Sequence, residues 1–167
     1  MVLIRAARTE EAAFLSELAL QSKAYWGYDE AFIAACREEL TVHESEVEPR
    51  RTTVAEADER ILGFITLEGE PPEGILGMMF VDPDAIGRGI GRLLFAHNIA
   101  TARKLGFVRV TIDADPNAEP FYRAMGAVRI GTTPSGSIPG RVLPLMAVTV
   151  TDYQAGNHAP APRSPAR

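Results

Sequence analysis

The spacing of hydrophobic and polar residues predicts a strand and then two helices at the start of the chain. Residues 2–7 (VLIRAA) are typical of a short strand. Thr9 is expected to cap the first helix, whose apolar face would include Phe14. Asp29 is expected to cap the second helix, over residues 30–40. The apolar residues of that helix recur at helical spacing: Phe32, Ile33, Cys36 and Leu40.

The rest of the chain predicts paired strands and one helical crossover. The further elements are strands 52–57 and 61–69, a loop at 70–74, a strand at 75–81, a helix at 92–106, a strand at 107–115, a helix at 118–127 and strands 128–131 and 142–150. The apolar run 75–81 (ILGMMFV) is typical of a central strand buried on both faces. Consecutive strands without an intervening helix favour antiparallel pairing. The predicted fold class is therefore α/β, with a mixed, mostly antiparallel sheet and one strand–helix–strand crossover.

The composition is that of one globular domain, which we place at residues 1–153. The chain has 167 residues, of which 46% are hydrophobic and 23% are charged, and these are ordinary values for such a domain. Residues 154–167 (QAGNHAPAPRSPAR) are rich in proline and poor in residues that could build a core. This tail is predicted to be disordered.

Charge and cysteine usage limit the possible partners and the compartment. The net charge of −5 argues against general nucleic-acid binding and suits a small or cationic partner. Cys36 is the one cysteine, so no disulfide can form within the chain and a reducing compartment is favoured. Arg5 and Arg8 interrupt the apolar start, unlike in a signal peptide, and no apolar stretch is long enough to span a membrane. We therefore expect a cytoplasmic protein without a membrane partner.

A glycine-rich segment between a predicted strand and a predicted helix is the strongest candidate site. Gly87, Gly89 and Gly91 alternate with other residues, and Arg88 and Arg92 add positive charge. Uncovered N–H groups at a helix start bind anions, so this loop suits a phosphate. A tight turn without a ligand is the alternative. The spacing fits neither a P-loop, which ends in Gly-Lys-Ser/Thr, nor the G-x-G-x-x-G dinucleotide fingerprint.

This stretch resembles the acetyl-CoA loop of the GNAT superfamily of N-acetyltransferases. The family pattern is Val-x-Pro after the central strand, followed by Gln/Arg-x-x-Gly-x-Gly/Ala. Val81-Asp82-Pro83 matches the first part, and residues 87–91 (GRGIG) match most of the second. Ile86 stands where the family usually has Gln or Arg.

A second match lies downstream, on the family helix Asn-x-x-Ala-x-x-Phe/Leu-Tyr-x-x-x-Gly-Phe. The matching positions are Asp115, Ala118, Phe121, Tyr122, Gly126 and Ala127. Asp115 replaces the usual Asn, and Ala127 replaces the usual Phe. The resemblance covers about residues 75–127, and the order of elements outside this range also agrees with the family.

The resemblance implies a GNAT-like fold, acetyl-CoA as the cofactor and direct attack of a primary amine on the thioester. The implied cofactor-binding residues are Phe80 and Val81, whose main chain would pair with the pantetheine arm, Gly87, Arg88, Gly89, Ile90, Gly91 and Arg92, which would hold the pyrophosphate, and Asp115, Ala118 and Phe121 of the second motif. Tyr122 matches the tyrosine that protonates or hydrogen-bonds the leaving thiolate; an ordinary half-buried aromatic is the alternative. A main-chain N–H near Val81 could polarise the carbonyl. The family often forms homodimers.

The residues that would deprotonate and bind the amine acceptor are less clearly indicated than those for the cofactor. Five carboxylates are candidates for the base that deprotonates the amine, and no motif selects one: Asp82, Asp113, Glu68, Glu70 and Glu73. The predicted acceptor-binding residues are Tyr25, Trp26 and Tyr28 between two helices, and Ser135, Ser137 and Arg141 in a later loop. Aromatic rings suit an apolar group or a cation, Arg141 suits a carboxylate, and core packing explains any one ring equally well. The acceptor is predicted to be an amine of a small molecule or a peptide.

Two other functions remain compatible with the sequence. The departures at Ile86 and Asp115 leave room for a CoA-binding sensor without turnover, and the loop alone would also suit another nucleotide-binding module. A cysteine nucleophile is not favoured, because the three histidines form no recognisable set with Cys36. We also predict no metal, since these residues lack the spacing of metal ligands.

Overall fold

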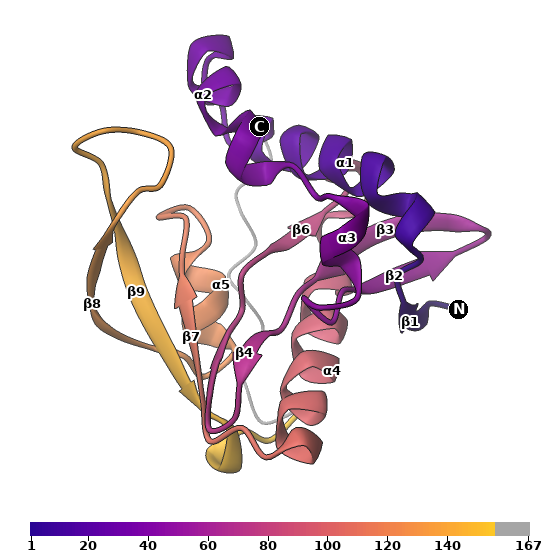
Figure 1. Cartoon of the computed structure of the whole chain (residues 1–167), viewed down its shortest axis with the longest axis vertical. Coiled ribbons are helices and arrows are strands. Elements are labelled where there is room, and N and C mark those ends of the chain that lie inside the picture. Colours follow the sequence, from indigo (N-terminus) through magenta and orange to yellow (C-terminus); the bar gives the residue numbers. More distant parts are fainter. Residues whose placement is uncertain (156–167) are drawn as a thin grey trace.

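The strands of the computed structural model, which describes residues 1–155, form two sheets (Figure 1). The first is antiparallel, in the order β1 (Leu3–Ala6), β2 (Thr53–Ala57), β3 (Arg60–Ile65) and β6 (Met79–Val81). The second has the order β4 (Glu68–Glu70), β5 (Glu73–Ile75), β7 (Arg109–Asp113), β9 (Val142–Thr149) and β8 (Val128–Pro134). In the second sheet β5 and β7 run parallel, and the other pairs are antiparallel. The predicted mixed, mostly antiparallel α/β class is confirmed.

The predicted continuous strand 75–81 is wrong, because it is broken and its halves belong to different sheets. β5 ends at Ile75 and β6 begins at Met79. Leu76 N–H still donates to Thr111 on β7 (2.9 Å), but Met78 N–H donates to the side-chain hydroxyl of Thr66 (2.9 Å). A hydroxyl that competes for a main-chain donor redirects the strand in this way, and an apolar run carries no sign of it. Beyond the break, β6 pairs with β3 and no longer follows β7.

The helices cover both faces of the first sheet. α1 (Ala12–Ala24), α2 (Glu30–Leu40) and α3 (Glu44–Val47) pack on one face, and α4 (Ile90–Leu105) packs on the other with α5 (Glu119–Ala124) nearby (Figure 1). Successive strand residues point to opposite faces. Val54 accordingly joins the core under α1, while Ala55 joins the core under α4. α4 connects β6 to β7 and is the predicted crossover.

The residues that cap the helices agree only in part with those predicted from the sequence. Asp29 caps α2 as predicted, because its carboxylate accepts from Phe32 N–H (2.8 Å). The prediction for Thr9 is wrong: Thr9 lies in a 3-10 turn, and the Glu11 carboxylate accepts from Arg8 N–H (2.8 Å) instead. Phe14 was also expected to be buried, but it is 50% exposed. Because a 3-10 turn over Thr9–Glu11 precedes α1, Glu11 rather than Thr9 stands at the N-cap of that helix.

The core reaches the end of the described chain. A last 3-10 turn, Val150–Asp152, brings Tyr153 into the core around α4, where the residue is buried. The tail predicted to be disordered, residues 154–167, lies outside the described residues from position 156 onward. Within residues 1–155, every helix is too short or too polar to cross a membrane.

Candidate functional site

The glycine loop forms the start of α4 and leaves its main chain uncovered. Gly87 and Gly89 have φ of +86° and +80°, a conformation that favours glycine, and no atom lies within 4 Å of where their Cβ atoms would be. The first bond of the helix joins Leu93 N–H to the carbonyl of Gly89 (3.1 Å). The N–H groups before Leu93 therefore have no partner within the helix, and no side chain caps them. The predicted open cradle is present at the positive end of a 16-residue helix.

The other residues of the loop differ in their surroundings. A Cβ on Gly91 would lie 3.3 Å from the Phe121 ring, so this glycine lets α4 and α5 pack closely. Ile90 is buried, Arg88 is exposed, and the charge of Arg92 acts on the nearby Tyr153. The third glycine therefore has a packing role in addition to any contact with a ligand.

β6, the strand that leads into the glycine loop, lies at the edge of the first sheet, and no described strand pairs with its outer side. Asp82 N–H donates to Leu62 on β3 (2.8 Å), and Phe80 lies opposite Phe64. Alternate residues of an antiparallel strand face the same neighbour, so the main-chain groups of Phe80 are used by β3. Those of Met79 and Val81 point to the open edge. The structure therefore favours Met79 and Val81, rather than Phe80, for pairing with an extended ligand.

Tyr122 is buried in the core cluster against which Met79 and Val81 of β6 pack. The residue is 5% exposed, and its ring packs against Phe95 and Phe121 with centroids 6.2 and 5.4 Å apart. In the described part of the chain the phenol makes no hydrogen bond. Burial raises its pKa, and the negative charge of Asp115 raises it further. The group therefore remains protonated at neutral pH, as a proton donor must.

A polar cluster joins the turn before α5 to α1 and to the β8–β9 loop. The Asp115 carboxylate accepts from Lys23 Nζ (2.5 Å), from the Tyr28 hydroxyl (2.9 Å) and from Asn117 N–H (2.8 Å). Arg141 donates to the Tyr28 hydroxyl (2.8 Å). Burial alone would raise the pKa of Asp115, but Lys23 and the other donors lower it overall. The Asp115 carboxylate thus points toward Lys23 and Tyr28, in the region where the acceptor-binding residues are predicted.

The predicted acceptor residues separate into two groups. Tyr28 and Arg141 meet in the polar cluster, whereas Tyr25 and Trp26 form an edge-to-face pair (5.5 Å) and are 49% and 40% exposed. In the β8–β9 loop, Ser137 donates to Glu39 of α2. The hydroxyl of its neighbour Ser135 accepts two N–H groups of the same loop.

Sequence reasoning missed Lys23 and Glu39, which join the site from helices. Lys23 lies 92 residues from Asp115, and Glu39 lies 98 residues from Ser137. Their only local signal is a position near a helix end, which many surface charges share. No local pattern could therefore have identified them.

The comparisons decide the family. A model of the acetyltransferase (GNAT) domain matches residues 8–135. The chain belongs to the GNAT acetyltransferase family. A peptidyl-lysine N-acetyltransferase, YjaB of Salmonella typhimurium, is 33% identical over 78 residues, which are 47% of this chain and 49% of YjaB. The chain thus matches about half the length of that relative.

Solved structures show the GNAT fold over most of the chain. PaiA N-acetyltransferase of Thermoplasma acidophilum, in complex with coenzyme A, has a TM-score of 0.74 at 21% identity, covering 89% of this chain and 99% of PaiA. A GCN5-related N-acetyltransferase of Rhodopseudomonas palustris has a TM-score of 0.72 at 26% identity, covering 88% and 94%. YncA of Salmonella typhimurium, solved with acetyl-CoA, has a TM-score of 0.67 at 19% identity, covering 93% and 97%.

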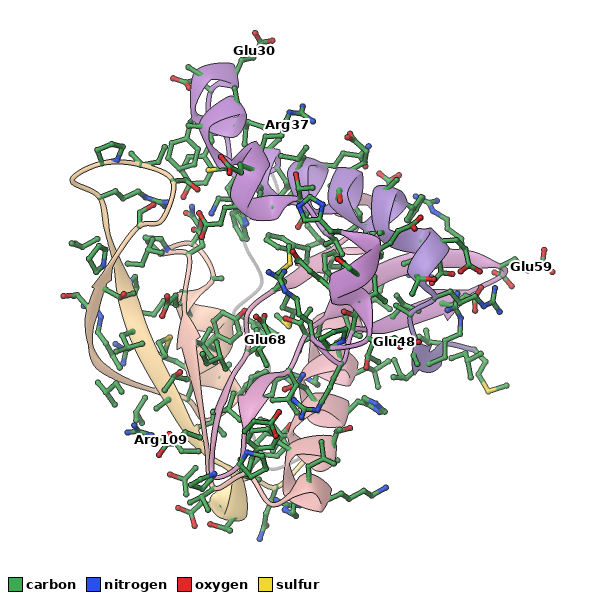
Figure 2. All side chains as sticks on the ribbon, in the orientation of Figure 1. Glu30, Arg37, Glu48, Glu59, Glu68 and Arg109 are labelled. Carbon is green, nitrogen blue, oxygen red and sulfur yellow. The ribbon has the colours of Figure 1, made fainter. Side chains whose placement is uncertain are left out.

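Within this GNAT domain, three of the five candidate bases have other roles or lie apart. Asp82 is buried, pairs with Arg60 (2.7 Å) and caps the turn after β6. Glu73 pairs with Arg109 (2.9 Å), which Figure 2 shows toward the far end of the second sheet. The side chain of Glu70 is 87% exposed. None of these three observations places a carboxylate at the strand break.

The other two carboxylates lie near the break. Glu68 accepts from the Thr66 hydroxyl (2.9 Å), its Oε1 lies 3.6 Å from Arg50 Nε, and its Oε2 would lie 1.5 Å from a Cβ added to Gly77. Figure 2 shows Glu68 near the middle of the molecule. Asp113 ends β7, and its pKa is raised by burial and by the charge of Glu39. Only the tertiary structure reduces the five candidate bases to Glu68 and Asp113.

Proposed function

We propose that this protein transfers the acetyl group of acetyl-CoA to a primary amine, which attacks the thioester directly. The observation that carries the proposal is the hydroxyl of the buried Tyr122, to which no described residue hydrogen-bonds, in the same core cluster as Ile90 of α4, with Met79 and Val81 of β6 packed against it. A glycine loop that served only to turn the chain would not need a hydroxyl donor close to it. The family, and relatives whose structures hold coenzyme A or acetyl-CoA, support the same choice.

The residues present fit this cofactor. The N–H groups of Gly87 and of Gly89 to Arg92 would bind the pyrophosphate, and the side chains of Arg88 and Arg92 would add positive charge. The N–H of Arg88 already donates to the carbonyl of Ala85 (3.3 Å). Met79 and Val81 would hydrogen-bond the amides of the pantetheine arm, while Ala118 and Phe121 would line it. Bound acetyl-CoA supplies a thioester carbonyl that an amine can attack. A main-chain N–H of Met79 or Val81 would stabilise negative charge on its oxygen, and the Tyr122 hydroxyl would donate a proton to the departing sulfur.

Glu68 is proposed to accept the proton of the amine, directly or through a water molecule. Its carboxylate lies against the main chain of Gly77, where β5 and β6 separate. The open edge at Met79 begins two residues further on. Glu68 therefore stands at the end of that edge farthest from the phosphate cradle, where the thioester would lie.

Glu68→Gln is expected to lower kcat/KM by about 100-fold at neutral pH, within the range for a general base. The loss should shrink as the pH rises, because an amine that is already neutral needs no base. Glu70→Gln, two residues along on an exposed side chain, is the matched control and should change little. If Asp113→Asn reproduces this pH-dependent loss and Glu68→Gln does not, Asp113 is the base.

Calorimetric titration with acetyl-CoA, and with NAD and ATP as controls, tests the proposed function first. Selective binding of acetyl-CoA, followed by acetylation of members of an amine library, is the expected result. Tighter binding of NAD or ATP would indicate another nucleotide-binding module. Binding of acetyl-CoA without acetylation of any amine would indicate a sensor.

The amine itself remains a small molecule or a peptide in this proposal. The similarity to a peptidyl-lysine N-acetyltransferase supports a lysine side chain as one acceptor class. A cytoplasmic location and a homodimer also stay predictions, which fractionation and light scattering would test.

A further inference from the structure

Two cations of the polar cluster share a single carboxylate. Lys23 and Arg141 both approach Asp115 Oδ2, at 2.5 and 3.6 Å. The side chains of Lys23, Arg141 and Asp115 are only 13%, 19% and 12% exposed. Charges this far from water are normally paired one to one, so the group of three carries one surplus positive charge.

Most of the donors in the cluster are unused. A lysine ammonium has three N–H donors and an arginine guanidinium has five. Among the described residues, Lys23 donates only to Asp115, and Arg141 donates only to the Tyr28 hydroxyl. No nitrogen of either side chain is both buried and without a partner among the described residues, so the unused donors are open to an incoming anion.

The Arg141 side chain is restricted by its neighbours in a way that favours the binding of an anion. Its guanidinium lies 4.9 Å from the centroid of the Phe32 ring and 5.3 Å from that of Tyr28. These two rings are stacked on each other at 4.0 Å. Packing against the two rings and the hydrogen bond to Tyr28 restrict the guanidinium, which reduces the entropy lost when a carboxylate binds.

The cluster is also connected to the proposed reaction centre. The main-chain oxygen of Asp115 accepts from Ala118 N–H (2.8 Å), and the next turn of α5 carries Tyr122. On the other side, the β8–β9 loop brings Arg141 and Ser137 together with Glu39 of α2. An acceptor reaching Tyr122 between these segments would pass close to Lys23 and Arg141.

We propose that Lys23 and Arg141 form a subsite for a carboxylate on the acceptor, which makes the preferred substrate an amino carboxylate rather than a simple alkyl amine. This inference rests on the proposed acetyl transfer and names its substrate class. Asp113 and Glu39 supply negative charge on the same side of the molecule, which suits the protonated amine of such a zwitterion. Arg141 and Lys23 would bind the carboxylate, and Asp115 would hold both cations in place.

The test compares amino acids with their carboxamides, which keep the size and lose the charge. With the full chain and acetyl-CoA, kcat/KM is expected to be about 10- to 100-fold higher for the carboxylates, the usual contribution of hydrogen bonds between charged groups. Arg141→Gln and Lys23→Gln should remove this preference, because they lower kcat/KM for the carboxylates far more than for the carboxamides. Arg37→Gln removes the same charge from an exposed position on α2 (Figure 2) and should have no effect.

Equal rates with both members of each pair would overturn the subsite, as would equal losses for both in the two variants. Weaker acetyl-CoA binding by Arg141→Gln would instead assign the cluster to the cofactor. Calorimetry of the same pairs on the CoA-loaded protein separates this inference from the proposed function. Selective binding of the carboxylates would support the subsite even if no amine is acetylated, and equal binding would overturn it.

Discussion

Tyr122→Phe is expected to lower kcat by about 10²- to 10⁴-fold, the usual contribution of a positioned proton donor. The substitution removes one hydroxyl that no described residue uses, so neither the packing against Phe95 and Phe121 nor any hydrogen bond is lost. Acetyl-CoA binding should therefore survive almost unchanged. A single-turnover assay, with calorimetry of acetyl-CoA on the same preparation, measures both quantities.

Tyr25→Phe is the matched control, because it removes the same hydroxyl from a residue that is 49% exposed. It should leave kcat unchanged. An unaltered kcat in Tyr122→Phe would show that the thiolate leaves without this donor. The residue would then be an ordinary core aromatic, and the proposed mechanism would lose its acid.

Gly89→Val is expected to weaken acetyl-CoA binding by about 100-fold or more. Gly89 has φ of +80°, which a β-branched residue adopts only with strain. The peptide would rotate and redirect the N–H groups proposed to bind the pyrophosphate, each worth roughly 1.5–3 kcal/mol toward a charged acceptor. Calorimetric titration with acetyl-CoA measures the loss, and circular dichroism checks that the variant folds.

Two further variants show whether conformation is the cause. Asparagine adopts positive φ at low cost, so Gly89→Asn should retain much of the affinity. Gly131→Val places the same side chain in open space on β8, where the backbone has no such φ, and should bind acetyl-CoA normally. Full affinity in Gly89→Val would mean that the loop does not hold the phosphates.

Much of the fold and part of the site could be predicted from local patterns. The glycine loop depends on backbone conformation and on its place between a strand and a helix, and both are written in consecutive residues. Gly87 and Gly89 accordingly have the positive φ that the sequence indicates, and α4 begins at Ile90, two residues before its predicted start. The cap at Asp29 was predictable for the same reason, since donor and acceptor are three residues apart.

Predictions that depended on distant residues succeeded less well. The run 75–81 was expected to be one strand, but the Thr66 hydroxyl and the Glu68 carboxylate, on a neighbouring segment, meet it at the break. This break is also what leaves the edge of β6 open. The choice of Met79 over Phe80 follows from the register with β3, which no property of residues 79–81 alone could reveal.

The sequence by itself determined the fold class, the family resemblance and the conformation of the glycine loop, because each rests on short-range spacing and on residue types with strong conformational preferences. Only the tertiary structure decided which carboxylates lie at the strand break, that no residue within 1–155 hydrogen-bonds the Tyr122 hydroxyl, and that Lys23, Tyr28, Asp115 and Arg141 meet. Contacts between residues some 90 or more positions apart are set by how the sheets and helices pack. Packing depends on the whole chain at once, and local patterns do not record it.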